Sequence, residues 1–305
     1  MRFWRIFRVL VIVIVGALVV IAASLVSSFF EGRRTVRVGD GERAYQLFVP
    51  AGYDTNQPVP LLLVYHMRDG FGWLMQEVTG FNAIAEREGF IVAYPDGVGR
   101  SWADGSGRYA ADSAEVDDVA FTAALIDQLS AQYRIDLNRV YTAGFDNGGM
   151  LALRLGCELP DRIAAVASVS GTLAENVKDS CSPPRPVPVL MMHGMADEVL
   201  PLDGLPGLTS VPEALLTWVL HNGCDSAPVL EQRDPVADGT SVRRELYVGC
   251  RDGVEVWYDA IAGGGHRWPG SHSIWQVWLP GPVSGDIDAS AEIWDFFDSY
   301  ALAGF

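Results

Sequence analysis

Three side chains able to transfer protons or attack carbon each follow an expected strand of this 305-residue chain. In chain order they are Asp146, Asp197 and His266, the last directly after three glycines. A histidine exchanges a proton readily near neutral pH, and a neighbouring carboxylate orients its ring and stabilises its charged form. We therefore expect His266 to act as general base and Asp197 as its acidic partner, with Asp146 at the nucleophile position.

The surroundings of Asp146 predict a strand, a sharp turn and a helix. An apolar, β-prone run at 140–143 stops at Gly144, and a Leu- and Ala-rich amphipathic stretch begins after Gly148. This is the layout of a nucleophile elbow, G-x-S-x-G, which presents one side chain above the sheet beside a helix N-terminus. The position reserved for serine holds Asp146, and aspartate tolerates left-handed backbone better than most residues.

Aspartate changes the chemistry of this position. A carboxylate needs no deprotonation, and it attacks saturated carbon in halides and epoxides to give an ester that histidine-activated water hydrolyses. Attack on an ester carbonyl would instead give a reactive anhydride with a poor driving force. The helix N-terminus and nearby backbone donors would also hold the carboxylate as a resident anion, which would block an oxyanion hole.

The elements that must position these side chains alternate between strand and helix. Apolar runs bounded by turn residues predict strands at 61–65, 90–94, 140–143, 163–170, 187–193, 243–248 and 254–261, after a hairpin at 35–38 and 44–49. Helices are expected at 81–88, 119–133, after the elbow, at 212–222 and at 289–300, with Asp117 or Asp118 as a helix cap. The alternation predicts an α/β fold with a mostly parallel sheet, helices on both faces and no large cap domain. Ligands in such folds bind at the carboxyl ends of the strands, so the three side chains should converge there.

Composition restricts the partners. The formal charge of −16 excludes a nucleic-acid partner, because phosphate binding needs a basic surface. With 49% hydrophobic residues the chain can bury one substantial core, so we expect a single α/β domain at 31–305. No metal or cofactor is expected, because no spacing resembles a zinc site and the triple glycine precedes a histidine instead of a phosphate-binding lysine.

Residues 1–30 form a separate segment. Arg2, Arg5 and Arg8 precede the uncharged stretch 9–30, which is long enough to span a bilayer as a helix. The stretch exceeds the apolar core of most signal peptides, so an uncleaved signal anchor with its N-terminus in the cytoplasm is favoured. A signal peptide cleaved near 26–28 is the alternative. Both predict an extracytoplasmic domain, either anchored to the membrane through 9–30 or secreted.

Export of the domain would place its four cysteines in an oxidising compartment, where disulfides form. Cys157, Cys181, Cys224 and Cys250 allow three pairings in an oxidising compartment. Sequence order suggests Cys157 with Cys181 and Cys224 with Cys250. Free buried thiols are the alternative.

Taken together, these motifs resemble extracellular poly(3-hydroxybutyrate) depolymerases and feruloyl or acetylxylan esterase-type α/β hydrolases. The resemblance covers about residues 35–300, and it is carried by 82–97, 116–121, the elbow, 193–197, 222–224, 249–253, 263–270 and 286–297. It implies an α/β-hydrolase fold, serine esterase chemistry and an ester, polyester or acylated polysaccharide as ligand. Asp197 and His266 fall on the family's acid and histidine positions.

The family's oxyanion region is altered as well. His66 matches the His-Gly pattern that follows the strand at 61–65, but Met67 replaces the glycine. The expected oxyanion donors are the backbone N–H groups of Arg68 or Asp69, together with that of Asn147 after the elbow. Substrate contacts are expected from four residues: His66, Met67, Trp102 and Trp268. The alternative for His66 is hydrogen bonding at the strand end, and the alternative for the two tryptophans is packing.

Three functions remain open from the sequence. The first is an esterase-family hydrolase in which Asp146 is either an altered nucleophile or an acid that assists His266 in activating water. The second is a catalytically silent relative that binds a polymer, ester or carbohydrate-linked ligand. The third is a displacement hydrolase for halides or epoxides, which the missing cap domain and the absence of a tryptophan after Asp146 disfavour.

Overall fold

The computed structural model describes Gly16 and residues 33–39 and 41–302. The predicted membrane-spanning stretch 9–30 therefore lies, apart from Gly16, outside the described residues. Within the described part of the chain, no helix has the length and apolar character needed to cross a membrane.

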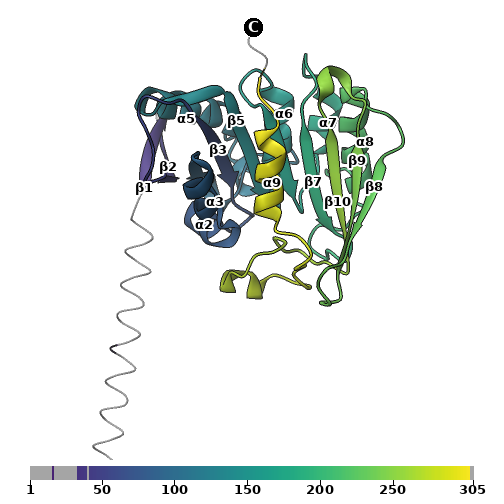
Figure 1. The fold of residues 1–305 in the computed structure, drawn as a ribbon. Coiled ribbons are helices and arrows are strands. Elements are labelled where there is room, and N and C mark those ends of the chain that lie inside the picture. The colour runs from purple at the N-terminus through teal and green to yellow at the C-terminus, as the bar shows by residue number, and fades with distance from the viewer. Residues whose placement is uncertain (1–15, 17–32, 40, 303–305) are drawn as a thin grey trace, which may run out of the picture.

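One ten-stranded sheet forms the centre of the molecule, in the order β1-β2-β4-β3-β5-β6-β7-β10-β9-β8 (Figure 1). Strands β4, β3, β5, β6, β7 and β10 are parallel, and antiparallel strands extend both edges. This confirms the mostly parallel sheet. The strands are β1 Arg33–Val38, β2 Gly41–Phe48, β3 Val59–Tyr65, β4 Ile91–Pro95, β5 Ile135–Phe145, β6 Ala165–Val169, β7 Val189–Gly194, β8 Val229–Arg233, β9 Ser241–Tyr247 and β10 Val256–Ala262.

Helices cover both faces of the sheet (Figure 1). One apolar cluster joins the strands to α5, α6 and α8, and a second, on the opposite face, joins them to α3 and α9. The α-helices are α2 Gly72–Thr79, α3 Phe81–Glu88, α4 Ala110–Ser113, α5 Asp118–Gln132, α6 Asn147–Glu158, α7 Glu175–Ser180, α8 Val211–Asn222 and α9 Ala289–Asp298. The 3₁₀ helices are η1 Val98–Arg100, η2 Arg251–Gly253 and η3 Ile274–Trp278.

Several elements differ from the sequence prediction. The sequence predicted no element where the structure has the helices α2, α4 and α7, the strand β8 and the 3₁₀ helix η3. The side chain of Asp117 caps α5 by accepting the Ala120 N–H at 2.8 Å, as predicted. Asp118 does not cap the helix, because its buried carboxylate pairs with Arg43 at 2.8 Å and accepts the Ala103 N–H.

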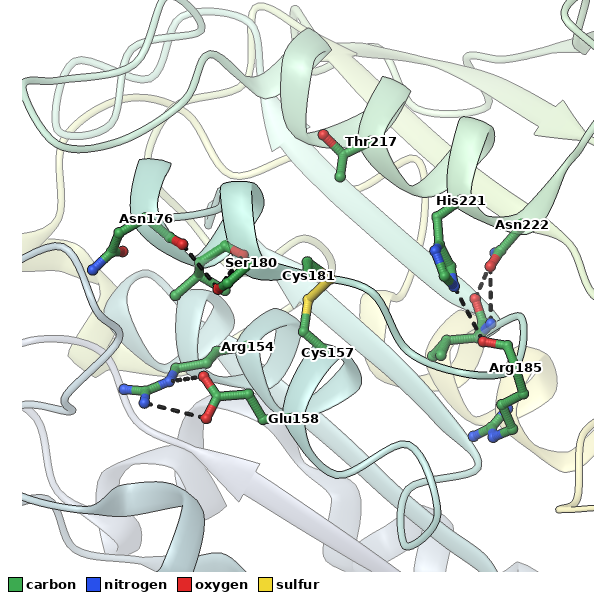
Figure 2. Close-up of a disulfide and its surroundings, with 12 residues drawn as sticks. Arg154, Cys157, Glu158, Asn176, Ser180, Cys181, Arg185, Thr217, His221 and Asn222 are labelled. Carbon is green, nitrogen blue, oxygen red and sulfur yellow. Dashed lines mark hydrogen bonds and ion pairs between the residues drawn. A yellow bond between two sulfur atoms is a disulfide. The ribbon is translucent and has the colours of Figure 1, made fainter.

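Both disulfides pair as sequence order suggested, Cys157 with Cys181 and Cys224 with Cys250. Figure 2 shows the first bridge joining the helix that follows the elbow, α6, to the end of α7, beside the ion pair of Arg154 and Glu158. The second bridge ties the chain after α8 to the turn before β10. One disulfide therefore closes the segment from α6 to the end of α7, and the other closes the segment from the end of α8 to the turn before β10.

Removing the first bridge with Cys157→Ser and Cys181→Ser should lower the free energy of unfolding by about 3 kcal/mol, because the unfolded chain regains loop entropy. Urea unfolding under non-reducing conditions measures this. The second bridge closes a loop of nearly equal length, with a sequence separation of 26 against 24, so Cys224→Ser with Cys250→Ser should cost a similar amount. Unchanged unfolding midpoints in both double variants would contradict the prediction.

Candidate active site

The strand–turn–helix elbow lies between β5 and α6. Asp146 has φ +56° and ψ −123°, and its N–H donates to the Val169 carbonyl at 2.9 Å. Two glycines permit this turn. A Cβ on Gly144 would lie 2.2 Å from the Gly148 backbone, and one on Gly148 would lie 2.4 Å from the carbonyl oxygen of Tyr65. Gly144 is therefore required where β5 meets the start of α6, and Gly148 is required where α6 approaches the end of β3.

The structure brings Asp146, Asp197 and His266 together. Nδ1 of His266 lies 2.8 Å from Oδ2 of Asp197, and Nε2 lies 3.9 Å from Oδ1 of Asp146. All three residues are buried, at 4%, 6% and 2% relative exposure for Asp146, Asp197 and His266. The ring of Phe145 stacks on that of His266 with the centroids 4.9 Å apart. The imidazole is therefore held between two carboxylates at the carboxyl ends of the strands.

Asp197 is held as a carboxylate. Burial raises its pKa, but the hydrogen bond and charge of His266 and the Leu200 N–H outweigh burial, so the pKa lies below its ordinary value. Its Oδ1 accepts the N–H groups of Val199 and Leu200 at 2.9 and 2.8 Å. A carboxylate can only accept, so Nδ1 of His266 carries the hydrogen and Nε2, which faces Asp146, is free to take a proton.

The expected oxyanion donors are partly occupied. The N–H of Arg68 donates to Oδ2 of Asp146 at 2.9 Å, whereas the N–H of Asp69 donates to the Arg100 carbonyl at 2.8 Å. The Asp69 donor is therefore already used by the protein. The resemblance implies that the Arg68 N–H faces a substrate oxygen. In this structure the carboxylate of Asp146 occupies that place.

Asn147 holds the loop beside the elbow through its side chain. Its Oδ1 accepts the Trp102 N–H at 2.6 Å, and its Nδ2 donates to the Trp102 carbonyl and to Oδ2 of Asp104, at 3.1 and 2.8 Å. Its backbone N–H opens α6, where helical N–H groups have no intrahelical partner. The side chain thus fixes structure, while the backbone group stays a candidate donor.

The four residues predicted to contact substrate are buried. His66 is fully buried; its Nδ1 donates to the Met67 carbonyl at 2.7 Å and its Nε2 accepts the Gly97 N–H at 2.9 Å. Trp102 and Trp268 are also buried, and their indole N–H groups donate to the His66 carbonyl and to Ser290 Oγ. These contacts favour packing and strand-end hydrogen bonding over substrate contact for these three residues, and Met67 is buried as well.

Three residues near the site lie outside the sequence prediction. Asp104 is buried, and burial raises its pKa to about 7. Burial also raises the pKa of Tyr109, as do the negative charges of Asp146 and Asp104. His193 lies 3.7 Å from Oδ2 of Asp197 and donates from Nε2 to the Leu200 carbonyl at 2.8 Å. Asp104 and Tyr109 lie in a glycine-rich stretch without hydrophobic periodicity, so no pattern in the sequence indicated that they lie near the site. His193 could have been found from its position four residues before Asp197.

No group of three or more His, Cys, Asp or Glu side chains suited to a metal ion occurs in the part of the chain that the structure describes. The two carboxylates beside His266 accept backbone N–H groups, Asp197 from Leu200 and Asp146 from Arg68.

An elbow, an acid and a histidine in this order on a mostly parallel sheet define an α/β hydrolase. The chain belongs to the Esterase PHB depolymerase family, which matches residues 43–230. This range contains the elbow and Asp197 but ends before His266.

Two curated relatives are similar to the chain. The chain is 32% identical to "Putative esterase NocK" of Nocardia uniformis subsp. tsuyamanensis over 280 residues, which cover 86% of this chain and 81% of that protein. It is 32% identical to Feruloyl esterase B of Piromyces equi over 234 residues, which cover 71% of this chain but 41% of that longer protein. The chain thus spans less than half the length of the second relative.

A solved structure has the same fold. Acetyl xylan esterase from Aspergillus awamori superposes with a TM-score of 0.58 at 16% identity, over 87% of this chain and 98% of that one. At this identity the likeness concerns the fold, and it confirms the predicted α/β-hydrolase architecture.

The pKa of His66 predicts a pH-dependent stability. Burial lowers it to about 4, from an ordinary value near 6.5, and a proton on Nε2 would also face the Gly97 N–H. The unfolded chain therefore binds a proton before the folded one does. The contribution of this group is fully present above pH 6.5, and the free energy of unfolding should fall by about 3 kcal/mol as the pH drops from 6.5 to 4.

Denaturant unfolding between pH 4 and 7 measures the slope. His66→Gln keeps an acceptor for Gly97 and removes the titration, so its slope should be shallower than that of the wild type. His272→Gln, at an exposed histidine, is the matched control and should keep the wild-type slope. Equal slopes in all three proteins would contradict the assignment.

Proposed function

We propose that the protein is an exported hydrolase of carboxylic esters whose reacting groups are Asp146, His266 and Asp197. The observation that carries the proposal is the 2.8 Å contact between Asp197 and His266, which leaves Nε2 of His266 facing the elbow residue at 3.9 Å. Family membership supports the ester class, because the relatives are named as esterases.

The arrangement supports activation of water by His266. Nε2 takes a proton as water attacks the acyl carbon, and Asp197 stabilises the resulting imidazolium across its short hydrogen bond. The same proton then passes to the departing alcohol, so that water and ester give acid and alcohol. Asp146, buried on the other side of the ring, adds a second negative charge that attracts the imidazolium.

A second function is favoured by the Arg68–Asp146 hydrogen bond. With Oδ2 bound to the backbone at 2.9 Å, Oδ1 is the oxygen that faces His266 and is available to attack saturated carbon in a halide or epoxide. The resulting aspartyl ester would keep its carbonyl oxygen at the Arg68 N–H, which would then stabilise the oxyanion when water attacks. No substrate oxyanion hole is needed on this route.

Two features support export as part of the proposal. Both disulfides suit an oxidising compartment outside the cytoplasm. The basic and apolar pattern of residues 1–30 suits an anchor or a signal peptide. Substrates would then include extracellular acylated polysaccharides or polyesters.

A single turnover in ¹⁸O-labelled water separates the two routes. With short acyl and aryl esters we expect label in the released acid and none in the peptide that carries Asp146, because water attacks the substrate directly. Mass spectrometry of product and peptide measures both. Label in Asp146 after reaction with a halide or epoxide would instead establish the aspartyl ester route, and no turnover with any of these substrates would make the protein a silent binder.

Replacing the elbow residue tests whether the rest of the site is intact. Asp146→Ser should raise ester hydrolysis roughly a hundredfold, because His266 can activate the hydroxyl and the Arg68 N–H becomes free to bind the oxyanion. Initial rates with a chromogenic short-chain ester measure this. Asp146→Ala frees the same donor without supplying a nucleophile, so it is the matched control and should not show the gain. Equal rates for both variants would mean that the oxyanion region cannot support serine chemistry.

A further inference from the structure

A hollow lies away from the elbow, between α8 and the strands β9 and β10. Its volume is about 400 Å³, within the range of small-molecule sites. Asp146, Asp197 and His266 are not among its lining residues. It is lined by Met195, Leu202, Pro212, Leu215, Leu216, Val219, Leu220, Cys224, Ser226, Arg243, Glu245, Tyr247 and Tyr258.

One wall of the hollow is aliphatic and open to solvent. Leu216 and Leu220 on α8 are 52% and 70% exposed, and Met195, which also lines the hollow, is 44% exposed. The neighbouring Leu215 and Val219 are buried in the core. Covering the exposed side chains with an apolar ligand would release their hydration, at about 25 cal/mol per Å² of apolar surface.

The opposite wall offers one unused polar group. Tyr258 is only 5% exposed, yet its hydroxyl forms no hydrogen bond with any residue that the structure describes. Burial raises its pKa, so the hydroxyl keeps its hydrogen. The hydroxyl oxygen still touches solvent, so a ligand oxygen that accepts from Tyr258 would take the place of a water molecule.

The charged groups of the hollow are already paired. Arg243 donates to Oε1 of Glu245 at 2.8 Å, and the Tyr247 hydroxyl donates to Oε2 of the same carboxylate at 2.9 Å. A charged ligand would have to break this cluster or remain unpaired beside it. The charge pattern therefore fits a neutral ligand.

We propose that this hollow is a second binding site, for a neutral aliphatic molecule with one hydrogen-bond-accepting oxygen, such as a ketone, ester or alcohol. The chain packs against Leu216, Leu220 and Met195, and the oxygen accepts the Tyr258 hydroxyl. Met195 and Leu202 flank Asp197 in the turn after β7, so an occupant contacts the segment that carries the catalytic acid. The proposal does not depend on the chemistry at Asp146.

The ketone 2-heptanone is a suitable probe, because it is neutral, accepts hydrogen bonds and is not hydrolysed. The chain has seven methionines, and their labelled methyl groups can be followed by NMR in the full-length protein. Met195 reports on this hollow, and Met67 reports on the catalytic site. We expect a saturable shift of the Met195 signal. A shift confined to Met67, or none up to the solubility limit, would overturn the proposal.

Variants identify the contacts. Tyr258→Phe should weaken the affinity roughly fivefold through loss of the donor. Leu216→Gln, at an exposed position that the fold does not require, should weaken it by a similar factor of roughly five. Ile274→Gln, at a still more exposed apolar residue on η3 that does not line the hollow, is the control and should bind normally. Unchanged affinity in both test variants, or equal binding of the charged heptanoate ion, would overturn the assignment.

Discussion

The hydrogen bond from the Arg68 N–H to Oδ2 of Asp146 determines what chemistry the elbow can perform. It exists because glycines at 144 and 148 let α6 approach the end of β3, which carries the Arg68 amide to within 2.9 Å of the elbow side chain. A serine at this position would leave that amide for a substrate oxyanion. The carboxylate of Asp146 instead accepts this N–H, so the donor is already occupied before a substrate binds.

The remainder of the site is built to hold negative charge around one imidazole. Asp197 receives two backbone N–H groups in addition to His266, and His193 fixes the Leu200 carbonyl in the same turn. Asp104 lies one layer further out, joined to the elbow through the side chain of Asn147. The hydrogen bond to Asp197 and the stacked ring of Phe145 hold the histidine in this position.

The sequence predicted the fold and the convergence of Asp146, Asp197 and His266, because apolar runs, glycine turns and chain order report on backbone geometry. It could not predict α7 or β8, which are short and largely polar or exposed. It left substrate contact and packing open for Trp102 and Trp268, and their burial and indole hydrogen bonds favour packing. The role of Asn147 was also beyond reach, since its partner Asp104 lies 43 residues away in an irregular loop.

The occupation of the Arg68 donor by Asp146 can be measured directly from backbone amide signals in solution. In the wild type, the Arg68 amide proton should resonate downfield as a charge-assisted hydrogen-bond donor, and it should move upfield in Asp146→Ala. The neighbouring Asp69 amide, which donates to the Arg100 carbonyl, should stay in place and provides an internal control. An Arg68 signal that does not respond to the loss of the carboxylate would contradict the account.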